Sequence, residues 1–484
     1  MSTTFDSGNN TPAAAAGPHP ARTPPPTGTS VLKNFGGSAT CRSTLRRPLD
    51  DAAWQRLFAR PDPAGITIRG SGASYSDAAL NDGGTVALST NQPKLRGWDR
   101  TTGILDVDGG VTLAQLLAFS IPQGWTLPVV PGTAAATVAG AFAADVHGKN
   151  HRVSGSFSSC VQQLILLSPG RGILTVGPQT EPDIFWSTAG GLGLTGMIAR
   201  LRLRLTAIPT SWLGTSDTVC TGLTQVLDVM RQESGRHDHV VAWIDGLARR
   251  GSTGRGVVST ADYLRPDDLP ESLRAKPLGY RPRQVHLGVP ATGNLIRPAL
   301  VRTYNALRFN RAGRATGTQV AGIPETFQPL DAIDDWPVLF GRRGLVQYQF
   351  AVPTGQEQVL QSVLEQLAVD ACPPVLVTLK MLGAPSLGHL SFPFHGWTLA
   401  LDFPAREVSE RPRLFERLDA EVSAAGGRIY LVKDMRLNPG LVPRMYPRLD
   451  EWRDVRDWLD PAHVLTSDLD RRLDLSGHTT GARR

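Results

Sequence analysis

The chain has 484 residues, enough for two or three domains with a sizeable buried core. Hydrophobic residues make up 41% and charged residues 19%, which excludes a chain that is disordered throughout. Lys and Arg (50) outnumber Asp and Glu (43), giving a net charge of +7 that is spread along the chain. This excess suits an anionic ligand and is too small to indicate nucleic-acid binding.

The cysteines, Cys41, Cys160, Cys220 and Cys372, are far apart, with no CxxC pair and no Cys/His cluster at metal-ligand spacing. We therefore expect reduced thiols and no metal site. No apolar run approaches the ~18–20 residues that span a bilayer, and the N-terminus lacks the pattern of a secretion signal. These features predict a cytoplasmic protein without a transmembrane segment and leave peripheral contact with a membrane open.

In chain order, residues 1–30 are rich in proline and poor in large apolar side chains, which predicts a disordered tail. From residue 31 to about 210, short β-like runs alternate with glycine-rich turns. Strands are predicted at 66–69, 85–89, 103–107, 164–168 and 196–205, with a helix at 112–119. Strands interleaved with helices indicate an α/β or α+β domain.

A second region, 211–427, has fewer glycines. It predicts helices at 223–233, 356–368 and 411–424 and strands at 239–244, 345–352, 375–380 and 398–403. Segments 252–284 and 310–327 show little periodicity and predict mobile loops. The last region, 428–475, predicts a strand at 428–432 and a helix at 449–459, followed by a frayed tail at 476–484.

The first glycine-rich segment, RGSGASYS at 69–76, directly follows a predicted strand. Its small residues allow several backbone N–H groups to converge on an anion such as a pyrophosphate. A GxG turn after a strand is also a common structural hairpin, so this segment is a weak signal alone. Residues 77–84 are typical of a loop rather than a helix, which argues against a nicotinamide-binding fold.

Two further segments are dense in small residues. Between 128 and 151 the chain is largely Ala, Gly, Val and Thr before it ends in polar side chains, so its backbone can lie flush against a flat ligand. The alternative interpretation is a tightly packed core helix with a polar cap. Residues 185–198 add a third glycine-dense turn that leads into a strand. Three such segments close together favour a shared ligand site.

Together these segments resemble the FAD-binding domain of the vanillyl-alcohol oxidase/p-cresol methylhydroxylase superfamily. Further motifs, in order in both halves of the chain, resemble the decaprenylphosphoryl-β-D-ribose 2′-oxidase family over residues 31–475. They are HGKNH at 147–151, GSF at 155–157, FW at 185–186, QYQF at 347–350, LK at 379–380, SFP at 391–393, GW at 396–397, DFP at 402–404, GGR at 426–428, KD at 433–434, MYPR at 445–448 and DLDRRL at 468–473.

The resemblance implies an α+β fold. In it, a two-part FAD-binding domain, residues 31–210 and 428–475, is interrupted by a substrate-binding domain, residues 211–427, built on an antiparallel sheet. The implied cofactor-binding residues are Arg69, Gly70, Ser71, Gly72, Ala73, Ser74, Tyr75, Ser76, Gly132, Thr137, Val138, Gly140, Asp145, His147, Gly148, Asn150, Ile198 and Tyr430. Relatives with covalent FAD have histidine where this chain has Ala73, and Cys160 lies outside the family's attachment positions. We therefore expect non-covalent FAD.

Three residues match catalytic positions of the family. Lys433 is expected at the end of a strand after Tyr430, where it would orient or deprotonate the substrate hydroxyl; the alternative is a solvated lysine paired with Asp434. Tyr75 matches a tyrosine next to the flavin, and His147 matches a histidine that forms a pocket wall and donates a hydrogen bond. An alcohol loses a proton as its hydride leaves, so a lysine near the flavin suits this chemistry.

Lys149, Gln349 and Lys380 match substrate-pocket positions of the family, and two lysines there suit a phosphate or diphosphate on the substrate. Trp243 is expected either to stack on a sugar ring or to be a core tryptophan.

Other positions of the substrate wall depart from the family pattern. Thr398 and Ala400 stand where the family has asparagine and cysteine, and Phe327 stands where the family has a tyrosine in a mobile loop. The flavin-binding motifs are retained, so these changes predict a different substrate alcohol.

The predicted function is FAD-dependent oxidation of a secondary alcohol of a ribosyl, nucleoside or aminocyclitol substrate to a ketone. In the family this is the first half of an epimerisation that an NAD(P)H-dependent ketoreductase completes. One alternative is the polyprenyl-phosphoryl ribose 2′-oxidase proper, and another is an alditol or lactone oxidase similar to D-arabinono-1,4-lactone oxidase, which Ala73 disfavours. A flavin-bound scaffold subunit without turnover is disfavoured because Lys433, Tyr75 and His147 are present.

Overall fold

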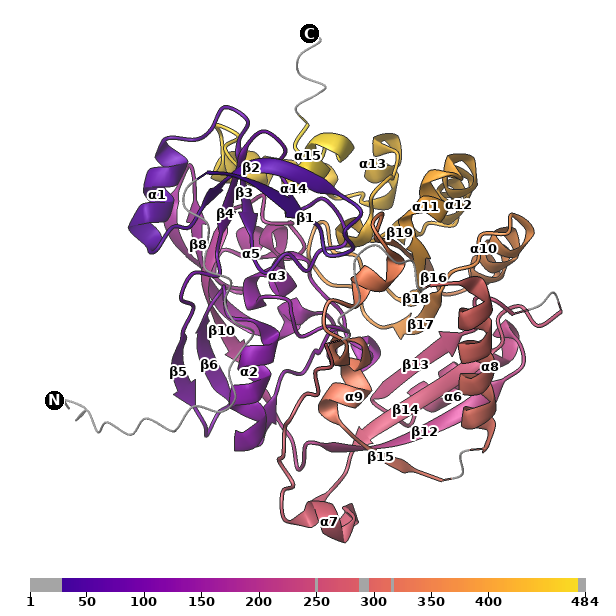
Figure 1. The fold of residues 1–484 in the computed structure, drawn as a ribbon. Coiled ribbons are helices and arrows are strands. Elements are labelled where there is room, and N and C mark those ends of the chain that lie inside the picture. The colour runs from indigo at the N-terminus through magenta and orange to yellow at the C-terminus, as the bar shows by residue number, and fades with distance from the viewer. Residues whose placement is uncertain (1–27, 249–250, 287–295, 315–316, 478–484) are drawn as a thin grey trace.

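The computed structural model describes residues 28–248, 251–286, 296–314 and 317–477 (Figure 1). The predicted N-terminal tail lies almost wholly outside these residues, and so does the C-terminal tail from residue 478. Ser476 is buried and donates its backbone N–H to Asp470 Oδ1 at 2.9 Å, so this residue belongs to the packed fold. None of the described helices is long and apolar enough to cross a membrane.

The N-terminal part begins with a four-stranded sheet. Its strands lie in the order β1 (Thr29–Lys33), β2 (Thr40–Arg46), β4 (Thr85–Leu88) and β3 (Ile66–Arg69). Helix α1 (Asp51–Ala59) connects β2 to β3, and Asp50 caps its N-terminus by accepting the N–H of Ala53. Trp54 and Phe58 of this helix pack with Ile66 in a shared cluster, because the two parallel pairings of β4 need a crossover that covers the sheet.

A second, antiparallel sheet has the order β5 (Leu95–Asp99), β6 (Ile104–Asp108), β10 (Met197–Arg204), β8 (Val161–Ser168) and β9 (Gly172–Val176). Helices α2 (Leu113–Ser120), α3 (Val138–Ala143) and α5 (Pro182–Thr188) pack with this sheet, whereas the short helix α4 (His151–Ser154) contacts strand β17 (Leu376–Leu382) of the large sheet described below. Strands β7 (Trp125–Thr126) and β11 (Thr206–Ala207) form a separate pair. Leu116 of α2, Phe142 of α3 and Phe185 of α5 share one core with β6 and β10.

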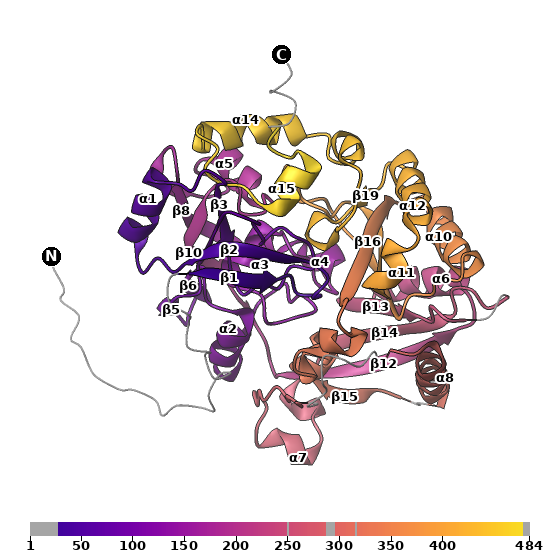
Figure 2. The ribbon, with the colours of Figure 1, turned by 45° about the horizontal axis from the view of Figure 1, so that its top comes forward.

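The described residues between Trp212 and Ile429 contribute one eight-stranded sheet, antiparallel throughout (Figures 1 and 2). Its order is β15 (Gln319–Gly322), β12 (Trp212–Cys220), β14 (Gly256–Tyr263), β13 (His239–Ile244), β17 (Leu376–Leu382), β18 (Gly396–Pro404), β16 (Leu345–Pro353) and β19 (Arg428–Ile429). Helices α6 (Leu223–Ser234), α10 (Gln358–Val369) and α12 (Pro412–Ala424) bury their apolar sides against one face of this sheet.

The two faces of the large sheet differ in character. Directly opposed residues of neighbouring strands point to the same face, and side chains alternate along each strand. Ala242, Leu379, Leu399 and Phe350 form one such row, and all four are buried in the core beneath α6, α10 and α12. The alternate row, Trp243, Thr378, Ala400 and Gln349, therefore points to the opposite face.

The two predicted loops contain regular structure, so that prediction is wrong. Segment 252–284 contains β14 and helix α7 (Glu271–Arg274), and segment 310–327 contains the end of α8 (Pro298–Arg314), β15 and α9 (Ile323–Phe327). Strand β14 has β12 on one side and β13 on the other. Gly256 is the first residue of this strand, and a Cβ there would collide with the carbonyl of Trp243. Glycine is needed for this close approach of two strands, but in the sequence the glycines of this segment are typical of a loop.

The C-terminal region returns to the N-terminal sheets through α13 (Val442–Met445), α14 (Leu449–Leu459) and α15 (Asp468–Leu473). Ile66 of β3 donates to the Val464 carbonyl at 2.8 Å and accepts from the Thr466 N–H at 3.0 Å. The strand predicted at 428–432 ends at Ile429, and Leu431–Lys433 form a 3₁₀ turn instead. The remaining short helices are α11 (Ala405–Ser409) and the 3₁₀ turns at Ile121–Gln123, Phe157–Cys160, Pro266–Asp268, Pro329–Ala332, Trp336–Phe340 and Pro439–Leu441.

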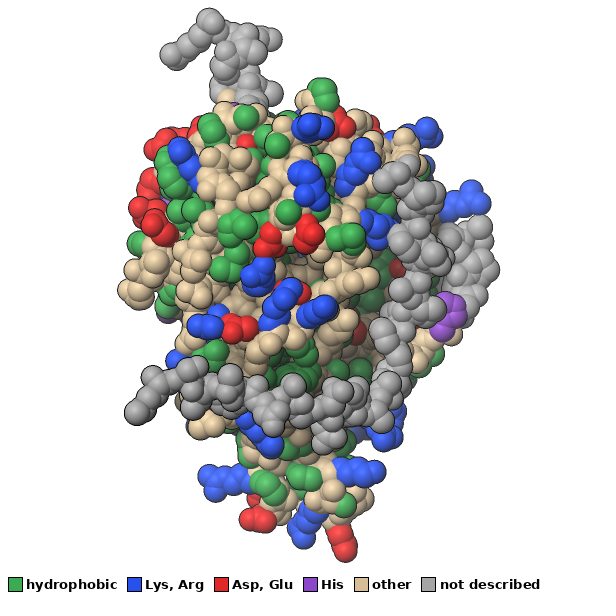
Figure 3. Space-filling view, turned by 90° about the vertical axis from the view of Figure 1, so that its left-hand side faces the viewer, with side chains coloured by type: hydrophobic (Ala, Val, Ile, Leu, Met, Phe, Trp, Pro, Cys, Tyr) green, Lys and Arg blue, Asp and Glu red, His purple; other side chains and the backbone are tan. Residues whose placement is uncertain are grey.

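All four cysteines are buried, and none forms a disulfide within the described chain. Figure 3 shows one face of the molecule, on which Lys and Arg side chains lie among Asp and Glu. The small positive charge of the protein is thus not gathered into one basic area on this face.

Candidate active site

The glycine-rich loop after β3 is shaped by Arg69. Its guanidinium donates to the Lys33 carbonyl at 2.8 Å and to the Ala79 carbonyl at 3.1 Å. Gly72 has a positive φ of 76° and lies so close that a Cβ there would collide with this guanidinium. Arg69 therefore holds the base of the loop, and Gly72 allows the chain to pass over it.

This loop meets the start of α3. A Cβ on Gly70 would lie 2.5 Å from Thr137 Oγ1, and that hydroxyl caps α3 by accepting the Gly140 N–H at 3.0 Å. Ser71, Gly132 and Gly140 are exposed, and no atom lies within 4 Å of an added Cβ on Gly132, whereas Val138 is buried below. Small residues that leave backbone exposed where two turns meet fit a phosphate-bearing flavin, because its pyrophosphate needs N–H groups without side chains in the way.

The same loop is tied to the 3₁₀ turn at 431–433. The Ser76 N–H and the Ser74 hydroxyl both donate to the Val432 carbonyl at 3.1 Å, and the two serine hydroxyls lie 3.0 Å apart. Ala73 lies in this loop directly before Ser74 and offers no side chain that could attach a flavin. Lys433 at the end of the turn places its Nζ 3.6 Å from the centre of the Tyr75 ring, within the range of a cation–π contact.

Lys433 is held in surroundings that favour the neutral amine. Burial lowers its pKa to about 7, with repulsion from Lys380 acting in the same direction and attraction to Asp402 acting against it. Asp434 is engaged elsewhere, because its Oδ2 accepts from Arg472 at 2.7 Å. The geometry thus differs from a solvated lysine paired with Asp434.

His147 lies between the two halves of the site. Its Nε2 is 3.0 Å from the Gln349 side-chain nitrogen, which also donates to Thr398 Oγ1 at 3.1 Å. Because an amide N–H donates, Nε2 is the acceptor and the ring proton sits on Nδ1, which has no partner among the described residues. Burial and the nearby charge of Lys380 hold the pKa of His147 well below its usual value, so the ring is neutral.

Two stacked aromatic rings lie near His147. Phe392 and Tyr430 stack on each other at 4.4 Å, and their centres lie 5.8 and 5.9 Å from that of His147. The Tyr430 hydroxyl donates to the Ala144 carbonyl at 2.8 Å, and its N–H donates to the Gln349 carbonyl at 2.9 Å. Phe392 was not among the predicted site residues, although its SFP motif was recognised in the sequence.

Two more lysines lie partly buried near these groups. Lys380 opposes Thr398 across the sheet, and burial lowers its pKa to about 8. Lys149 donates to the Thr326 carbonyl, and burial together with repulsion from Lys380 and Arg308 lowers its pKa to about 7. Lys380 thus lowers the pKa of both Lys149 and Lys433, and a bound anion would relieve this repulsion.

Sequence reasoning missed two acidic residues of the site. Asp402 lies two residues after Ala400 on the same face of β18, is buried, and accepts from Gln347 Nε2 at 2.7 Å; burial raises its pKa to about 6. The two-residue spacing from Gln349 to Gln347 and from Ala400 to Asp402 was the available signal. Asp331 accepts the Ala134 N–H at 2.7 Å and holds the loop that contains Gly132, a contact between distant segments with no sequence signal.

Some predicted residues have their polar atoms engaged within the protein. Asp145 accepts the Ser158 N–H at 3.1 Å and the Ser391 hydroxyl at 2.5 Å. Asn150 donates to the Pro128 carbonyl at 2.7 Å, and Gly148 is packed where a Cβ would lie 2.7 Å from Asn150 Oδ1. Ile198 is a buried residue of β10. In this structure these residues shape the backbone around the site.

Two predicted substrate residues lie apart from the cluster around Lys433. Trp243 is buried against Val257 and Ala312, with the Arg308 guanidinium 5.0 Å from the centre of its ring, which matches the core interpretation. Phe327 lies on α9 rather than in a loop and packs its ring 4.7 Å from that of His239.

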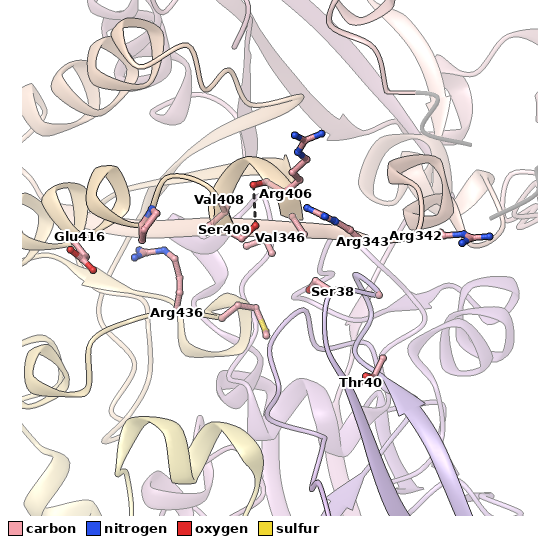
Figure 4. A pocket seen from close by; sticks show the side chains of 14 residues that line it. Ser38, Thr40, Arg342, Arg343, Val346, Arg406, Val408, Ser409, Glu416 and Arg436 are labelled. Atoms are coloured by element: carbon pink, nitrogen blue, oxygen red, sulfur yellow. Dashed lines mark hydrogen bonds between the residues drawn. The ribbon is translucent and has the colours of Figure 1, made fainter. Parts of the chain in front are cut away.

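A separate pocket of about 610 Å³ lies between the turn after β1 and helices α11 and α12 (Figure 4). None of the predicted site residues lines it. Of the four arginines that line it, Arg406 and Arg343 pair with Glu410 at 2.6 and 3.9 Å, and Arg436 pairs with Asp419 at 2.5 Å. Its charges are therefore largely satisfied within the protein, and the Lys433 cluster is the better candidate site.

Known proteins resemble this chain both in the segment that forms the candidate site and along nearly its whole length. The family model described as "FAD binding domain" matches residues 57–177, which include the glycine-rich loop and the start of α3. Decaprenylphosphoryl-beta-D-ribose oxidase of Mycolicibacterium smegmatis is 32% identical over 93% of this chain and 98% of its own. An uncharacterized protein of Streptomyces coelicolor is 37% identical over 75% of this chain and 100% of its own.

L-gulono-1,4-lactone dehydrogenase of Mycobacterium tuberculosis is 23% identical over 92% of this chain and 99% of its own. The similarity to the ribose oxidase covers nearly the whole of both chains, well beyond the FAD-binding segment. The chain therefore belongs to the decaprenylphosphoryl-β-D-ribose oxidase family of FAD-dependent oxidoreductases, within the vanillyl-alcohol oxidase/p-cresol methylhydroxylase superfamily.

Proposed function

We propose that this FAD-dependent oxidoreductase, which acts on CH–OH groups, oxidises a secondary alcohol of a sugar-like substrate to a ketone. The observation that carries the proposal is Lys433, a buried amine with a pKa of about 7 that lies on Tyr75 beside the flavin loop. When bound, FAD supplies the acceptor for the hydride of the alcohol carbon. Because burial favours the neutral amine, Lys433 can take the hydroxyl proton.

The other residues of the site have matching roles in this proposal. His147 forms a neutral wall and offers its Nδ1–H to the ligand, while Gln349 fixes the ring through Nε2. Tyr75 supports the Lys433 ammonium group when that group is charged. The glycine-rich loop and the start of α3 would hold the pyrophosphate, and FAD would be bound without a covalent link.

The substrate class follows from the charges around the pocket. Lys149, Lys380 and Lys433 are partly buried, and Lys380 repels the charge of the other two, which favours a substrate that carries a phosphate or diphosphate. Two relatives are named for a ribose derivative and for an aldonolactone, which supports a sugar-like skeleton. The replacements at Thr398 and Ala400 favour a ribosyl, nucleoside or aminocyclitol alcohol over a polyprenyl-phosphoryl ribose.

Domain roles and cellular context are parts of the same proposal. Residues 31–210 and 428–475 would form the FAD-binding domain, and their contacts through Ile66, Val464 and Thr466 support this. Residues 211–427 would form the inserted substrate-binding domain on the large sheet. A cytoplasmic location and an NAD(P)H-dependent ketoreductase that reduces the product to an epimer stay predictions.

The test uses the purified holoenzyme. Acid precipitation should release all the yellow colour into the supernatant, whereas colour in the pellet would contradict non-covalent FAD. Candidate ribosyl phosphates, nucleosides, aminocyclitols, aldonolactones and polyprenyl-phosphoryl ribose are then added without oxygen while the flavin absorbance is followed. A substrate that bleaches the flavin should give a product that gains deuterium at a secondary carbon on reduction with borodeuteride. Bleaching by lactones alone, or by none of the compounds, would overturn the proposal.

A further inference from the structure

Helix α8 exposes a row of large apolar side chains. Leu300, Tyr304 and Leu307 are 60%, 59% and 65% exposed, respectively. Their spacing of four and three residues places them on one face of the helix. Exposed apolar residues are ordinary when they are scattered singly, but a continuous row is typical of an interaction surface.

The opposite face of α8 fixes the orientation of the helix. Asn305 is buried and donates to Asp245 Oδ1 at 2.7 Å, and Ala312 packs into the cluster around Trp243. Arg308 reaches down over the Trp243 ring. The row of apolar residues therefore faces away from the sheet. In Figures 1 and 2, α8 lies at the outer edge of the molecule beside β12 and β14, against which it packs.

Arginines flank this row at both ends. Residues 298–314 include Arg302, Arg308, Arg311 and Arg314 and contain no Asp or Glu, and Arg297 lies directly before them. Arg311 continues the row at the next helical position, and Arg297 precedes it by three residues. Among the described residues, no carboxylate lies within ion-pair distance of Arg297, Arg302, Arg311 or Arg314, in contrast to the paired Arg406 and Arg448 elsewhere on the surface.

We propose that α8 docks the enzyme on an anionic lipid bilayer. Leu300, Tyr304 and Leu307 enter the boundary between headgroups and acyl chains, and the flanking arginines contact lipid phosphates. This inference goes beyond the proposed function, because it depends on no substrate.

The charge of the helix favours a bilayer over the other partners. A second copy of the chain docked through the same row would bring two sets of unpaired arginines together, which is unfavourable. A nucleic acid would use the arginines and leave the apolar row exposed. Anionic lipid satisfies both the apolar and the cationic groups of α8 at once.

Helix α8 packs on the same face of the large sheet as the candidate substrate residues. Arg308 contacts Trp243, and Trp243 begins the cross-strand row that runs through Thr378 and Ala400 to Gln349. A bilayer against α8 would thus lie on the side of the sheet that carries the candidate substrate residues.

Co-sedimentation of the holoenzyme with vesicles tests the proposal. One set of vesicles contains phosphatidylglycerol mixed with phosphatidylcholine, and the other contains phosphatidylcholine alone. The apolar row is removed in the combined variant Leu300→Gln, Tyr304→Gln and Leu307→Gln, and the charge is reduced in Arg311→Gln with Arg314→Gln. The matched control, Leu49→Gln with Ile173→Gln and Val369→Gln, changes exposed apolar residues that lie apart in the fold.

We expect the wild type and the control to bind the anionic vesicles and to be released by salt. Both α8 variants should bind at least about tenfold more weakly while keeping the flavin spectrum, since their changed side chains are exposed. Equal binding by the wild type and the α8 variants, or no binding by the wild type, would overturn the proposal. So would a dimer in sedimentation velocity without lipid that the apolar variant dissociates, because the row would then be a subunit interface.

Discussion

At the scale of single residues, Lys433 is subject to opposing influences on its proton affinity. Burial and Lys380 favour the neutral amine, whereas Asp402 favours the ammonium ion. Only the neutral amine accepts a proton from the substrate. If Lys433 is the base, flavin reduction should therefore speed up as the pH rises through about 7 and level off above it.

Replacement of Lys433 tests its role directly. Lys433→Ala should keep the spectrum of bound FAD and slow anaerobic flavin reduction by about 10²–10⁴-fold, the usual contribution of one positioned proton-transfer group. Lys276→Ala, which changes an exposed lysine far along the chain, serves as the control and should react like the wild type. Reduction of Lys433→Ala at nearly the wild-type rate would move the role to Lys149 or Lys380.

Asp402 should set the pH at which Lys433 becomes neutral. Asp402→Asn removes the negative charge that raises the pKa of Lys433, so this pKa should fall and the rise in rate should move to lower pH. Asp402→Glu keeps the charge and should leave the profile closer to that of the wild type. The measurement is the rate of anaerobic flavin reduction between about pH 5 and 9. A profile unchanged in Asp402→Asn would separate Asp402 from Lys433.

Thr398 and Ala400 should control the choice of substrate. Thr398 Oγ1 accepts from Gln349 and donates to the Phe350 carbonyl, and Ala400 opposes Gln349 across the sheet, so both border the proposed pocket. Thr398→Asn with Ala400→Cys should raise kcat/KM for polyprenyl-phosphoryl ribose by about tenfold or more, which one regained hydrogen bond can supply. Stopped-flow flavin reduction measures this for both proteins. Efficient oxidation of that lipid by the unchanged protein would show that these positions do not set specificity.

At the scale of elements, the 3₁₀ turn at Pro329–Ala332 holds the loop that contains Gly132 and Ala134, which borders the proposed FAD site. Asp331→Ala would leave the Ala134 N–H without its acceptor, and an unpaired buried amide costs about 1–3 kcal/mol. We expect the dissociation constant of FAD to rise about fivefold or more, measured by titration of the apoprotein. Asp331→Asn keeps an acceptor oxygen and should lie near the wild type. Equal FAD affinity in Asp331→Ala would detach this turn from cofactor binding.

Elements with a clear local residue pattern were predicted with the bounds that the structure shows. Strand Ile66–Arg69, strand His239–Ile244 and helix Leu449–Leu459 have the predicted bounds. The buried residues of the helix recur every three to four positions, and the two strands are short runs rich in β-branched residues. Strand Gly256–Tyr263 and helix Pro298–Arg314 were missed. In the strand, Gly256 allows two strands to approach closely, so glycine did not mark a loop there. In the helix, the row of apolar residues lies on the exposed side, so its pattern does not indicate a buried face.

The candidate site was predictable where it rests on motifs. Tyr75 and Lys433 belong to such motifs. They are far apart in the chain, but in the structure the Lys433 Nζ lies 3.6 Å from the centre of the Tyr75 ring. Asp402 was indicated only by its two-residue spacing from Ala400 on β18. Asp331 belongs to the site through a tertiary contact, and a single sequence carries no signal for which distant N–H a carboxylate will meet. Their contribution follows from the register of strands and loops, which only the folded chain defines.

At the scale of the whole molecule, the end of the chain closes on its beginning. Arg472 of α15 binds both carboxylate oxygens of Asp77, at 3.0 and 2.8 Å, and Asp434 Oδ2 at 2.7 Å. Asp77 directly follows the glycine-rich loop, and Asp434 directly follows Lys433. One guanidinium thereby joins the loop proposed for the cofactor to the turn proposed for proton transfer, and the site depends on elements from both ends of the chain.

Because all four thiols are buried, their reaction with an alkylating reagent measures local opening of the protein. Cys41 lies in β2, Cys160 before β8, Cys220 in β12 and Cys372 after α10, and burial raises the pKa of Cys160 and Cys372 to about 12. An alkylating reagent therefore reacts only when the surrounding layer opens, and peptide mass spectrometry resolves the four rates. FAD should slow alkylation of Cys41 and Cys160 more than that of Cys220 and Cys372, since a ligand protects the layers that it contacts. Equal protection at all four would show that the protein opens as one unit.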